Sequence, residues 1–552
     1  MPAGAATGAA RAWRSLERAA DRVFGADINP LRQLGGLGFF LFWLIVISGG
    51  WLYVFYETSV EGAWDSVQHL TVAQWWGGGL MRSLHRYGSD AFVVVVGLHL
   101  VRELALGRYT GFRWYSWISG VPTLWLIIGS GVIGYWMVWD ERALFAATAT
   151  AEWFGVLPGF DPALVRNFLV PEAVSDRLFS LLAFLHIGLP LALLLVMWAH
   201  VQRLTRPRSA IHRRLAGWTL AWLLGLSLVW PAQSLAPADP QMLPDRLALD
   251  WFYLAPLAAS DAGAPGLVWT FVLGITLVLM IAPWLTHAPR PAPAEVDPEH
   301  CSGCARCFED CPYAAIAMAP HPGGRGQIAV VDADRCAACG ICAGACPSST
   351  PFRRSERLVS GIDLPWLTVD ALRQQVDAAL AMSPGPDPVP GADPAPESDS
   401  TPESDSTPES DSAPTILVFG CAHGAHPGSS PAGSAGIETA GSRVRMITLP
   451  CAGMLPPSFI EYAQRHGADG VVVAACPGDD CEYRFGSHWL AGRLAGEREP
   501  RLRAAADGTR LLQMEVAREE GVLLDNGIAS LARGLNAARA GSIPETEEIG
   551  DD

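Results

Sequence analysis

The chain has 552 residues, of which 50% are hydrophobic and 17% are charged. Its positive mean hydropathy over this length excludes an ordinary soluble enzyme and indicates membrane-spanning segments. The formal charge of −16 arises mainly from acids in residues 385–414 and 545–552. The balance therefore carries no information on nucleic acid, and nucleic acid is not an expected partner.

Residues 1–33 form a basic segment, and we expect no cleavable signal there because the first apolar stretch is too long for one. A membrane domain is expected over 34–290, as an all-α bundle. Each of its six predicted spans suits a hydrocarbon core of about 30 Å. These spans are residues 34–56, 87–106, 116–139, 178–201, 216–236 and 267–288.

The distribution of Arg predicts the orientation of the bundle. Thirteen Arg belong to the N-terminus and the loops on its side, and six belong to the opposite side. Because cytoplasmic loops carry the excess of basic residues, the N-terminus and everything after residue 288 are expected in the cytoplasm. The expected location is the inner membrane of a bacterium, with several passes.

Four His belong to the second and fourth spans, in two pairs that are each 14 residues apart: His85 with His99, and His186 with His200. Fourteen residues leave two side chains within about 40° of one helix face and about 21 Å apart. The two spans run in the same direction, so His85 is expected to face His186 and His99 to face His200. Two bis-imidazole sites are the arrangement needed for two b-type haems; the alternative is isolated polar residues that bond neighbouring helices.

Glycines of the first and third spans repeat this spacing, as a flat porphyrin needs where it meets a helix: Gly36 and Gly50, and Gly120 and Gly134. Gly35 and Gly49 are also 14 apart, which leaves the register on the first span open. Ordinary helix packing is the alternative role for such small residues.

Three segments, MRSLHRYGSDAFVVVVGLHLVRELALG (81–107), VIGYWMVWDE (132–141) and ADPQMLPDRLALDWFYL (238–254), resemble the cytochrome b subunit of respiratory bc complexes. The resemblance covers about residues 30–290. It implies that Arg82 and Arg102 pair with haem propionates and that quinone is a substrate.

In that family the Glu of a Pro-Glu-Trp-Tyr signature lies in an extracytoplasmic quinol-oxidising pocket. The signature here is Leu-Asp-Trp-Phe, so the resemblance implies that Asp250 carries protons for quinone chemistry; a solvated loop acid is the alternative. Asp140 and Glu141 are further candidates. They stand where the family has Gly-Gln, which is a departure from the family pattern.

Residues 291–360 are rich in Cys and contain two runs of the form Cys-x2-Cys-x2-Cys-x3-Cys-Pro. This doubled run is typical of bacterial ferredoxins with two [4Fe–4S] clusters, whereas zinc sites use separate Cys-x2-Cys knuckles. The fourth Cys of each run binds the other cluster, in an α+β ferredoxin-like fold. The first cluster is thus expected on Cys301, Cys304, Cys307 and Cys346, and the second on Cys336, Cys339, Cys342 and Cys311.

Residues 361–414 combine an amphipathic helix, expected at 364–382, with a Pro/Ser/Asp/Glu stretch that ends in the repeat PESDST-PESDST-PESDSA. Such a composition does not bury a core, so it predicts a disordered acidic tether. We expect this tether to let the last domain swing or dock.

Residues 415–552 alternate strand-like and helical runs, which predicts a small α/β domain. Three of its four Cys end or closely follow a predicted strand, and the fourth lies close to the third along the chain. All four are therefore expected at one sheet edge, as ligands of a [2Fe–2S] or zinc site. They are Cys421, Cys451, Cys476 and Cys481. Unpaired buried thiols are the alternative.

The segments ILVFGCAHG, VRMITLPCAGM and HGADGVVVAACPGDDCEYRFG resemble the delta (iron–sulfur) subunit of methyl-viologen-reducing hydrogenases. The resemblance covers about 415–500 and implies one [2Fe–2S] cluster and a flavoprotein partner of the heterodisulfide reductase type. Gly424 replaces one family Cys, and His423 and His426 are weaker ligand candidates.

Together these features predict an electron conduit between quinone and a cytoplasmic flavoprotein, through two haems b, two [4Fe–4S] clusters and one [2Fe–2S] cluster. The alternative is a haem and iron–sulfur membrane anchor of a hydrogenase or sulfur-metabolising complex, without quinone chemistry of its own. Hydrogenase or other dehydrogenase subunits fit as partners, besides membrane lipid, and a homodimer is compatible with the sequence.

Overall fold

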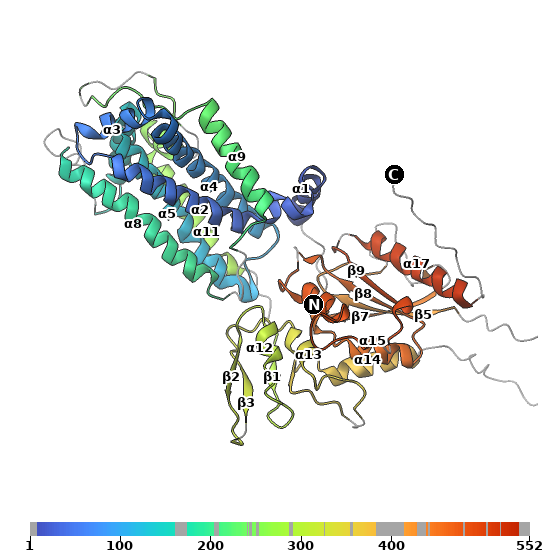
Figure 1. The fold of residues 1–552 in the computed structure, drawn as a ribbon. Coiled ribbons are helices and arrows are strands. Elements are labelled where there is room, and N and C mark those ends of the chain that lie inside the picture. The colour runs from blue at the N-terminus through green and yellow to red at the C-terminus, as the bar shows by residue number, and fades with distance from the viewer. Residues whose placement is uncertain are drawn as a thin grey trace, which may run out of the picture. The chain divides into compact units, whose positions relative to one another are not determined.

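The protein is described from a computed structural model (Figure 1). The structure describes residues 8–159, 174–203, 209–239, 241, 246–249, 253–285, 291–324, 326–353, 357–381, 413–427, 438–439, 442–478, 481–503, 506–518 and 520–539. It divides into a membrane unit, Ala5–Pro289, and a cysteine-rich unit, which comprises Met1–Gly4 and Arg290–Asp552. We describe each unit separately.

The membrane unit is helical throughout its described elements. α2 packs along α4, and α5 packs along α8, so the bundle is built from two closely packed helix pairs. The main helices are α1 (Gly8–Phe24), α2 (Leu34–Phe55), α3 (Gly62–Val72), α4 (Leu80–Ala105), α5 (Trp114–Val138), α6 (Glu141–Phe154), α8 (Asp176–Val201), α9 (Arg213–Val229), α10 (Ala255–Asp261) and α11 (Pro265–Leu285).

Among the described residues, four helices are long and apolar enough to cross a membrane: Leu34–Phe55, Gly111–Val138, Asp176–Val201 and Pro265–Leu285. The sequence predicts six spans. The other two predicted spans coincide with α4, which carries charged side chains in its first half, and with α9, which has 17 residues. Length and composition thus support four of the six.

The dicluster part of the cysteine-rich unit is small and has little regular structure. β2 (Ile316–Pro320) pairs with β3 (Gln327–Val331), and β1 (Glu295–Val296) pairs with β4 (Ile362–Asp363), both antiparallel. Two five-residue helices, α12 (Arg306–Asp310) and α13 (Ile341–Ala345), each lie inside a Cys run and pack together.

The C-terminal part contains a five-stranded sheet in the order β6-β7-β5-β8-β9, in which the last four strands are parallel (Figure 1). Alternate β5 residues enter two different cores: Leu417 and Phe419 face one, and Ile416 and Val418 face the other. Burial on both faces explains the continuous apolar runs. The strands are β5 (Thr415–Cys421), β6 (Glu438–Thr439), β7 (Ser442–Leu449), β8 (Gly470–Ala475) and β9 (Leu511–Glu515), and the helices around them are α14 (Val369–Ala381), α15 (Ser458–Arg465), α16 (Gly486–Leu494) and α17 (Gly521–Arg539).

Helix α14 belongs to the core of the C-terminal sheet. Its residues Val369, Leu372 and Val376 are fully buried there, and Asp377 accepts a 2.7 Å hydrogen bond from the hydroxyl of Tyr462 in α15. The acidic repeat lies outside the described residues, but α14 before it and β5 after it share one core. The tether therefore cannot act as predicted, as a joint about which the C-terminal domain swings.

Candidate metal centres

His85 of α4 and His186 of α8 face each other with their ring centres 6.2 Å apart. Two metal–nitrogen bonds of about 2.0 Å, extended by about 1.2 Å from each nitrogen to its ring centre, place two ring centres about 6.4 Å apart. The spacing therefore fits one metal ion held between the two rings, as in a bis-imidazole haem.

The hydrogen bonds of these rings leave Nε2 of each ring available to bind a metal. His85 Nδ1 donates to the carbonyl of Ile45 at 3.0 Å, and His186 Nδ1 donates to the carbonyl of Ser130 at 3.0 Å. A carbonyl only accepts, so Nδ1 carries the proton and Nε2 keeps its lone pair for a metal. The sequence analysis did not identify these carbonyl partners, because they lie on other helices.

His99 and His200, on the same two helices, are also neighbours. His200 Nδ1 lies 3.1 Å from the hydroxyl of Ser119, which itself donates to the carbonyl of Tyr115 and so accepts from the imidazole. The same tautomer follows for His200. The bundle therefore brings the four His together in the two predicted pairs.

Four glycines lie directly against the four rings. A Cβ at Gly49 would fall 2.8 Å from His85 Cε1, and one at Gly35 would fall 3.6 Å from His99 Cε1. On α5, Gly134 stands against His186 and Gly120 against His200, at 3.0 and 3.2 Å. Gly120 and Gly134 are thus placed as predicted. On α2 the glycines against the rings are Gly35 and Gly49, the second of the two registers that the sequence leaves open, whereas a Cβ at Gly50 meets nothing within 4 Å.

The two predicted propionate ligands differ in their free hydrogen-bonding capacity. Arg102 is 6% exposed; its Nε donates to Glu17 at 2.8 Å, and its Nη2 is buried without a partner among the described residues. A buried guanidinium nitrogen without a partner is suited to bind a carboxylate, such as the propionate of a haem. Arg82 donates to Ser234 at 2.8 Å and to Thr71, so both of its terminal nitrogens already have partners.

The acids predicted to carry protons have different surroundings. Asp140 is buried and caps α6: one oxygen accepts from the Ala143 amide at 2.9 Å and the other from the Leu235 amide at 3.0 Å. Glu141 follows as the first residue of α6. Asp250 lies outside the described residues. The residue beside Asp140, Trp139, lines a cavity of about 520 Å³ that the sequence analysis did not identify.

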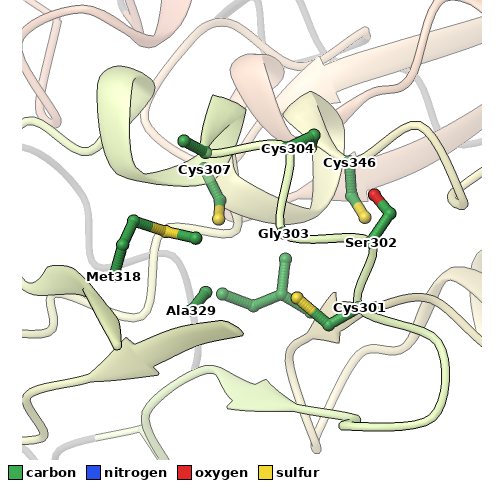
Figure 2. A pocket seen from close by; sticks show the side chains of 11 residues that line it. Cys301, Ser302, Gly303, Cys304, Cys307, Met318, Ala329 and Cys346 are labelled. Atoms are coloured by element: carbon green, nitrogen blue, oxygen red, sulfur yellow. The ribbon is translucent and has the colours of Figure 1, made fainter. Parts of the chain in front are cut away.

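The first predicted cluster site forms a pocket in the structure. Cys301, Cys304, Cys307 and Cys346 line one small cavity, and in Figure 2 the sulfurs of Cys301, Cys307 and Cys346 point into a common space. Cys346 comes from the second run, as the predicted exchange of ligands requires. Gly303 in the Cys301 loop has φ +68° and approaches the carbonyl of Gln327 where any side chain would collide.

The chemistry of this pocket fits a cationic cluster. Burial, together with the neighbouring thiols of Cys346, Cys304 and Cys301, raises the pKa of Cys307 to about 12. Four thiolates cannot coexist here without a positive group, and metal binding is what releases such protons. Among the described residues, no group of three or more His, Cys, Asp or Glu side chains is close enough together to hold a single metal ion. A cubane cluster is larger than a single ion and needs its thiolates farther apart.

The second predicted set is also assembled. Cys342 is buried, and burial raises its pKa well above the ordinary value, with added contributions from four neighbouring thiols, among which Cys311 and Cys307 belong to the first run. Burial likewise raises the pKa of Cys339, and Cys311 and Cys336 are charged neighbours of it. The four residues Cys336, Cys339, Cys342 and Cys311 therefore form one group.

The four C-terminal Cys converge at the carboxyl end of the parallel sheet. Cys421 Sγ lies 3.9 Å from Cys476 Sγ, and Cys481 is within hydrogen-bonding reach of both Cys451 and Cys476. Hydrogen bonds from these two thiols lower the pKa of Cys481 to about 2. The four buried thiols match the donor set of an iron–sulfur or zinc site.

Gly486 is a part of this site that sequence reasoning missed. A Cβ at this position, the first residue of α16, would fall 2.0 Å from Cys451 Sγ and 3.7 Å from Cys481 Sγ. Only a residue without a side chain fits. Of the weaker ligand candidates, His423 lies edge-on to Tyr483, with ring centres 5.4 Å apart.

Comparisons with known families match three successive parts of the chain. A model of Cytochrome b/b6/petB matches residues 20–207, one of the 4Fe-4S dicluster domain matches 300–350, and one of the methyl-viologen-reducing hydrogenase, delta subunit, matches 416–537. All three recognised resemblances are thereby confirmed.

Relatives in other organisms match the membrane unit. The menaquinol:cytochrome c reductase cytochrome b subunit of Geobacillus thermodenitrificans is 30% identical over 204 residues, which are 35% of this chain and 89% of that protein. The subunit of the same name from Bacillus subtilis is 30% identical over 198 residues, 34% of this chain and 86% of that protein.

A solved structure, "Hyperthermophilic respiratory Complex III", matches with a TM-score of 0.39 and 20% identity, over 50% of this chain and 83% of that chain. Haem b and [4Fe–4S] clusters are the cofactors that the matched families imply. With its four imidazoles paired in a helical bundle and its cysteines gathered in the soluble part, the chain belongs to the cytochrome b family, extended by a 4Fe-4S dicluster domain and a hydrogenase delta-subunit domain.

Proposed function

We propose that this electron-transport membrane protein carries electrons between the quinone pool and a soluble flavoprotein oxidoreductase of the heterodisulfide reductase type. The observation that carries the proposal is the joining of paired membrane imidazoles, with ring centres 6.2 Å apart, to three cysteine groups in one chain. We assign the substrate chemistry to that partner.

When bound, two haems b, two [4Fe–4S] clusters and one [2Fe–2S] cluster would each hold and release single electrons. The residues of the chain hold and tune these groups. His85 with His186 and His99 with His200 would be the haem ligands, and the hydrogen bonds of His85, His186 and His200 leave their Nε2 lone pairs available for this role. The orphaned Nη2 of Arg102 would be a positive partner for a propionate. Apolar side chains of α2, α4, α5, α8 and α9 pack together in this bundle.

The proposed orientation is that of a bacterial inner-membrane protein, with the N-terminus and the cysteine-rich unit in the cytoplasm. The excess of Arg on one side of the predicted spans supports it. The quinone-reactive side would then be extracytoplasmic, at the end of the bundle that carries Asp140 and the cavity beside Trp139.

The test uses the purified full-length chain in detergent. Pyridine haemochrome analysis should return two protohaems per chain, and anaerobic addition of a menaquinol analogue should reduce them, followed by the iron–sulfur signals in EPR. Absence of protohaem, or haems that dithionite reduces but quinol does not, would overturn the proposal.

A second candidate function is a haem and iron–sulfur anchor subunit whose quinone chemistry takes place elsewhere. The arrangement of Asp140 favours it, because both carboxylate oxygens are occupied by the backbone amides of Ala143 and Leu235. An acid committed to helix capping is not free to relay protons.

The substitution Asp250→Asn separates these two functions. The quinone-reactive chain should lose most of its quinol-dependent haem reduction, because the amide cannot accept the proton released with each electron. The anchor should reduce its haems at an unchanged rate. Asp239→Asn, in the same predicted loop, is the matched control.

A further inference from the structure

The residue before Cys311 is a buried carboxylate held by the C-terminal domain. Asp310 is 2% exposed. One of its oxygens is paired with Arg493 of α16 at 2.5 Å, and the other accepts from Nε of Arg498 at 2.9 Å. Two ion pairs thus tie the ligand loop of the second cluster site to the C-terminal part, one to α16 through Arg493 and one to the segment after α16 through Arg498.

Arg493 reaches three cysteine-bearing segments at once. Its side chain is fully buried, and besides Asp310 it donates to the carbonyl of Gly453 at 2.9 Å, two residues after Cys451. Its Nη2 also lies 3.5 Å from the carbonyl of Ile341, which stands between Cys339 and Cys342. A single guanidinium therefore connects the loops of the second cluster site with a loop of the four-cysteine site.

The segment around Cys342 and the loop that follows Cys451 also approach each other closely. A Cβ at Gly344, in α13, would fall 2.3 Å from the carbonyl oxygen of Gly453, and one at Gly340 would fall 2.7 Å from Met454. No other residue type allows this approach. On the other side of the junction, Cys339, Ile341, Cys451 and Trp489 form one apolar cluster. The indole of Trp489 donates to the Asp310 carbonyl at 3.2 Å.

We propose that Arg493 and Asp310 are positioning residues that lock the second [4Fe–4S] ligand set against the four-cysteine site. Electrons then pass directly across the Cys339–Cys451 contact without any domain movement. In each transfer one electron leaves one centre, which is oxidised, and arrives at the other, which is reduced; no atom or proton is exchanged. The proposal rests on the proposed electron-transfer function of these centres.

The choice of an ion pair for this junction has a physical reason. A buried ion pair adds little stability compared with apolar side chains of similar size, but it accepts only one geometry. The transfer of an electron depends steeply on distance, so a junction that fixes the two ligand loops is more useful than one that merely holds them together. Arg498 supplies a second contact to the same carboxylate and stacks over Trp489, 3.8 Å from the ring centre.

The first experiment asks whether the junction survives without the tether. A protease site is placed within residues 382–412 of the full-length protein, and the chain is cut there. Because α14 shares the core of the C-terminal sheet, fragment 413–552 should remain bound in any case. The proposal further requires that the magnetic coupling between the dithionite-reduced centres, seen as fast spin relaxation in EPR, is unchanged, and loss of this coupling would overturn it.

The second experiment changes the lock itself. Arg493→Met should retain all the iron but weaken the spin coupling, and electron transfer between the two centres should slow severalfold, because its rate falls steeply as the centres move apart. Arg539→Gln is the matched control, because it removes an ion pair with Asp469 that is remote from the junction.

Arg498→Gln keeps the test decisive if Arg493→Met loses iron, because it leaves the buried guanidinium in place and should give a smaller loss of coupling. Coupling and transfer rates that equal those of the unmodified protein in both variants would overturn the proposal. Because dithionite supplies the electrons, failure of the quinone hypothesis would leave these results unaffected.

Discussion

Single atoms decide where the metal groups fit. The carbonyls of Ile45 and Ser130 fix the tautomers of His85 and His186, and glycines without side chains stand against the rings. In the cysteine-rich unit, Gly486 plays the same part beside Cys451. At this scale two substitutions test the placement of these glycines, and each has a second glycine in open space as its control.

Gly49→Val should push the His85 ring out of place, because even a Cβ falls 2.8 Å from Cε1. We expect the protohaem content to fall from two to one per chain, measured by pyridine haemochrome analysis. Gly50→Val is the control, since that position has open space within 4 Å, and it should keep both haems. Equal haem loss in both variants would contradict this placement of α2.

Gly486→Ala should abolish the iron–sulfur signal of the C-terminal site while leaving the dicluster signals intact, because the new methyl group would overlap Cys451 Sγ. Iron analysis and EPR of the reduced protein measure both. Gly534→Ala in α17, where nothing lies within 4 Å, should change neither and should raise stability slightly through helix propensity. A full C-terminal signal in Gly486→Ala would be inconsistent with the site described.

The ends and loops of helices give the next level of organisation. α6 begins at a buried cap, Asp140, whose carboxylate also holds the chain at Leu235. α12 and α13 are only five residues each, yet each carries a cluster ligand and places the last Cys of its run across from the other run. Two predictions follow from these elements.

Asp140→Ala should lower the free energy of unfolding by about 0.5–2 kcal/mol, the cost of losing a helix cap. Asp140→Asn should cost less than Asp140→Ala, because its side-chain oxygen still caps α6 at Ala143, although its amide nitrogen no longer accepts from Leu235. Thermal unfolding followed by haem absorbance measures both, alongside quinol-dependent reduction. An Asn variant that is stable but inactive toward quinol would instead make Asp140 a proton carrier.

Cys346→Ser should remove the first [4Fe–4S] cluster, although Cys346 belongs to the second run, because its sulfur lines the pocket of Cys301, Cys304 and Cys307. Spin quantification should show one cubane signal, with coupling to the C-terminal centre retained. Cys311→Ser should abolish that coupling. The reverse outcome would mean that each run binds its own cluster.

At the scale of the whole molecule, the centres are expected to work in series. Two His pairs at different depths share the same two helices, and the cysteine-rich unit joins its second ligand set to the C-terminal site through Arg493. Loss of one centre should therefore divide the remaining centres into those that quinol still reduces and those that it no longer reduces.

His200→Leu should leave the haem of His85 and His186 reducible by quinol and stop reduction of every iron–sulfur centre, measured by visible absorbance and EPR in one sample. Dithionite should still reduce those centres. His212→Leu, outside the pairs at the start of α9, is the control and should behave like the unmodified protein. Quinol reduction of the clusters in His200→Leu would exclude a serial route.

Residue spacing alone was enough to predict the His pairs and the two Cys runs, because 3.6 residues per turn and short Cys loops place side chains without reference to the rest of the fold. The four C-terminal Cys were instead predicted from their places at or near the ends of predicted strands, since the carboxyl ends of parallel strands meet at one edge of a sheet. The register of α2 glycines, the capping role of Asp140 and the orphaned nitrogen of Arg102 could not be predicted. Each depends on which atoms of a distant helix lie nearby, to within about one residue of rotation.

The tertiary structure also decided what the acidic stretch connects. In the sequence, α14 looks like the start of a tether, but its apolar face is buried with β5 in a single core. Likewise nothing local marks Asp310 or Arg493, which are 183 residues apart and meet only after both domains have folded. Ligand identity is thus a local property of this chain, whereas the contacts between its centres are set by long-range packing.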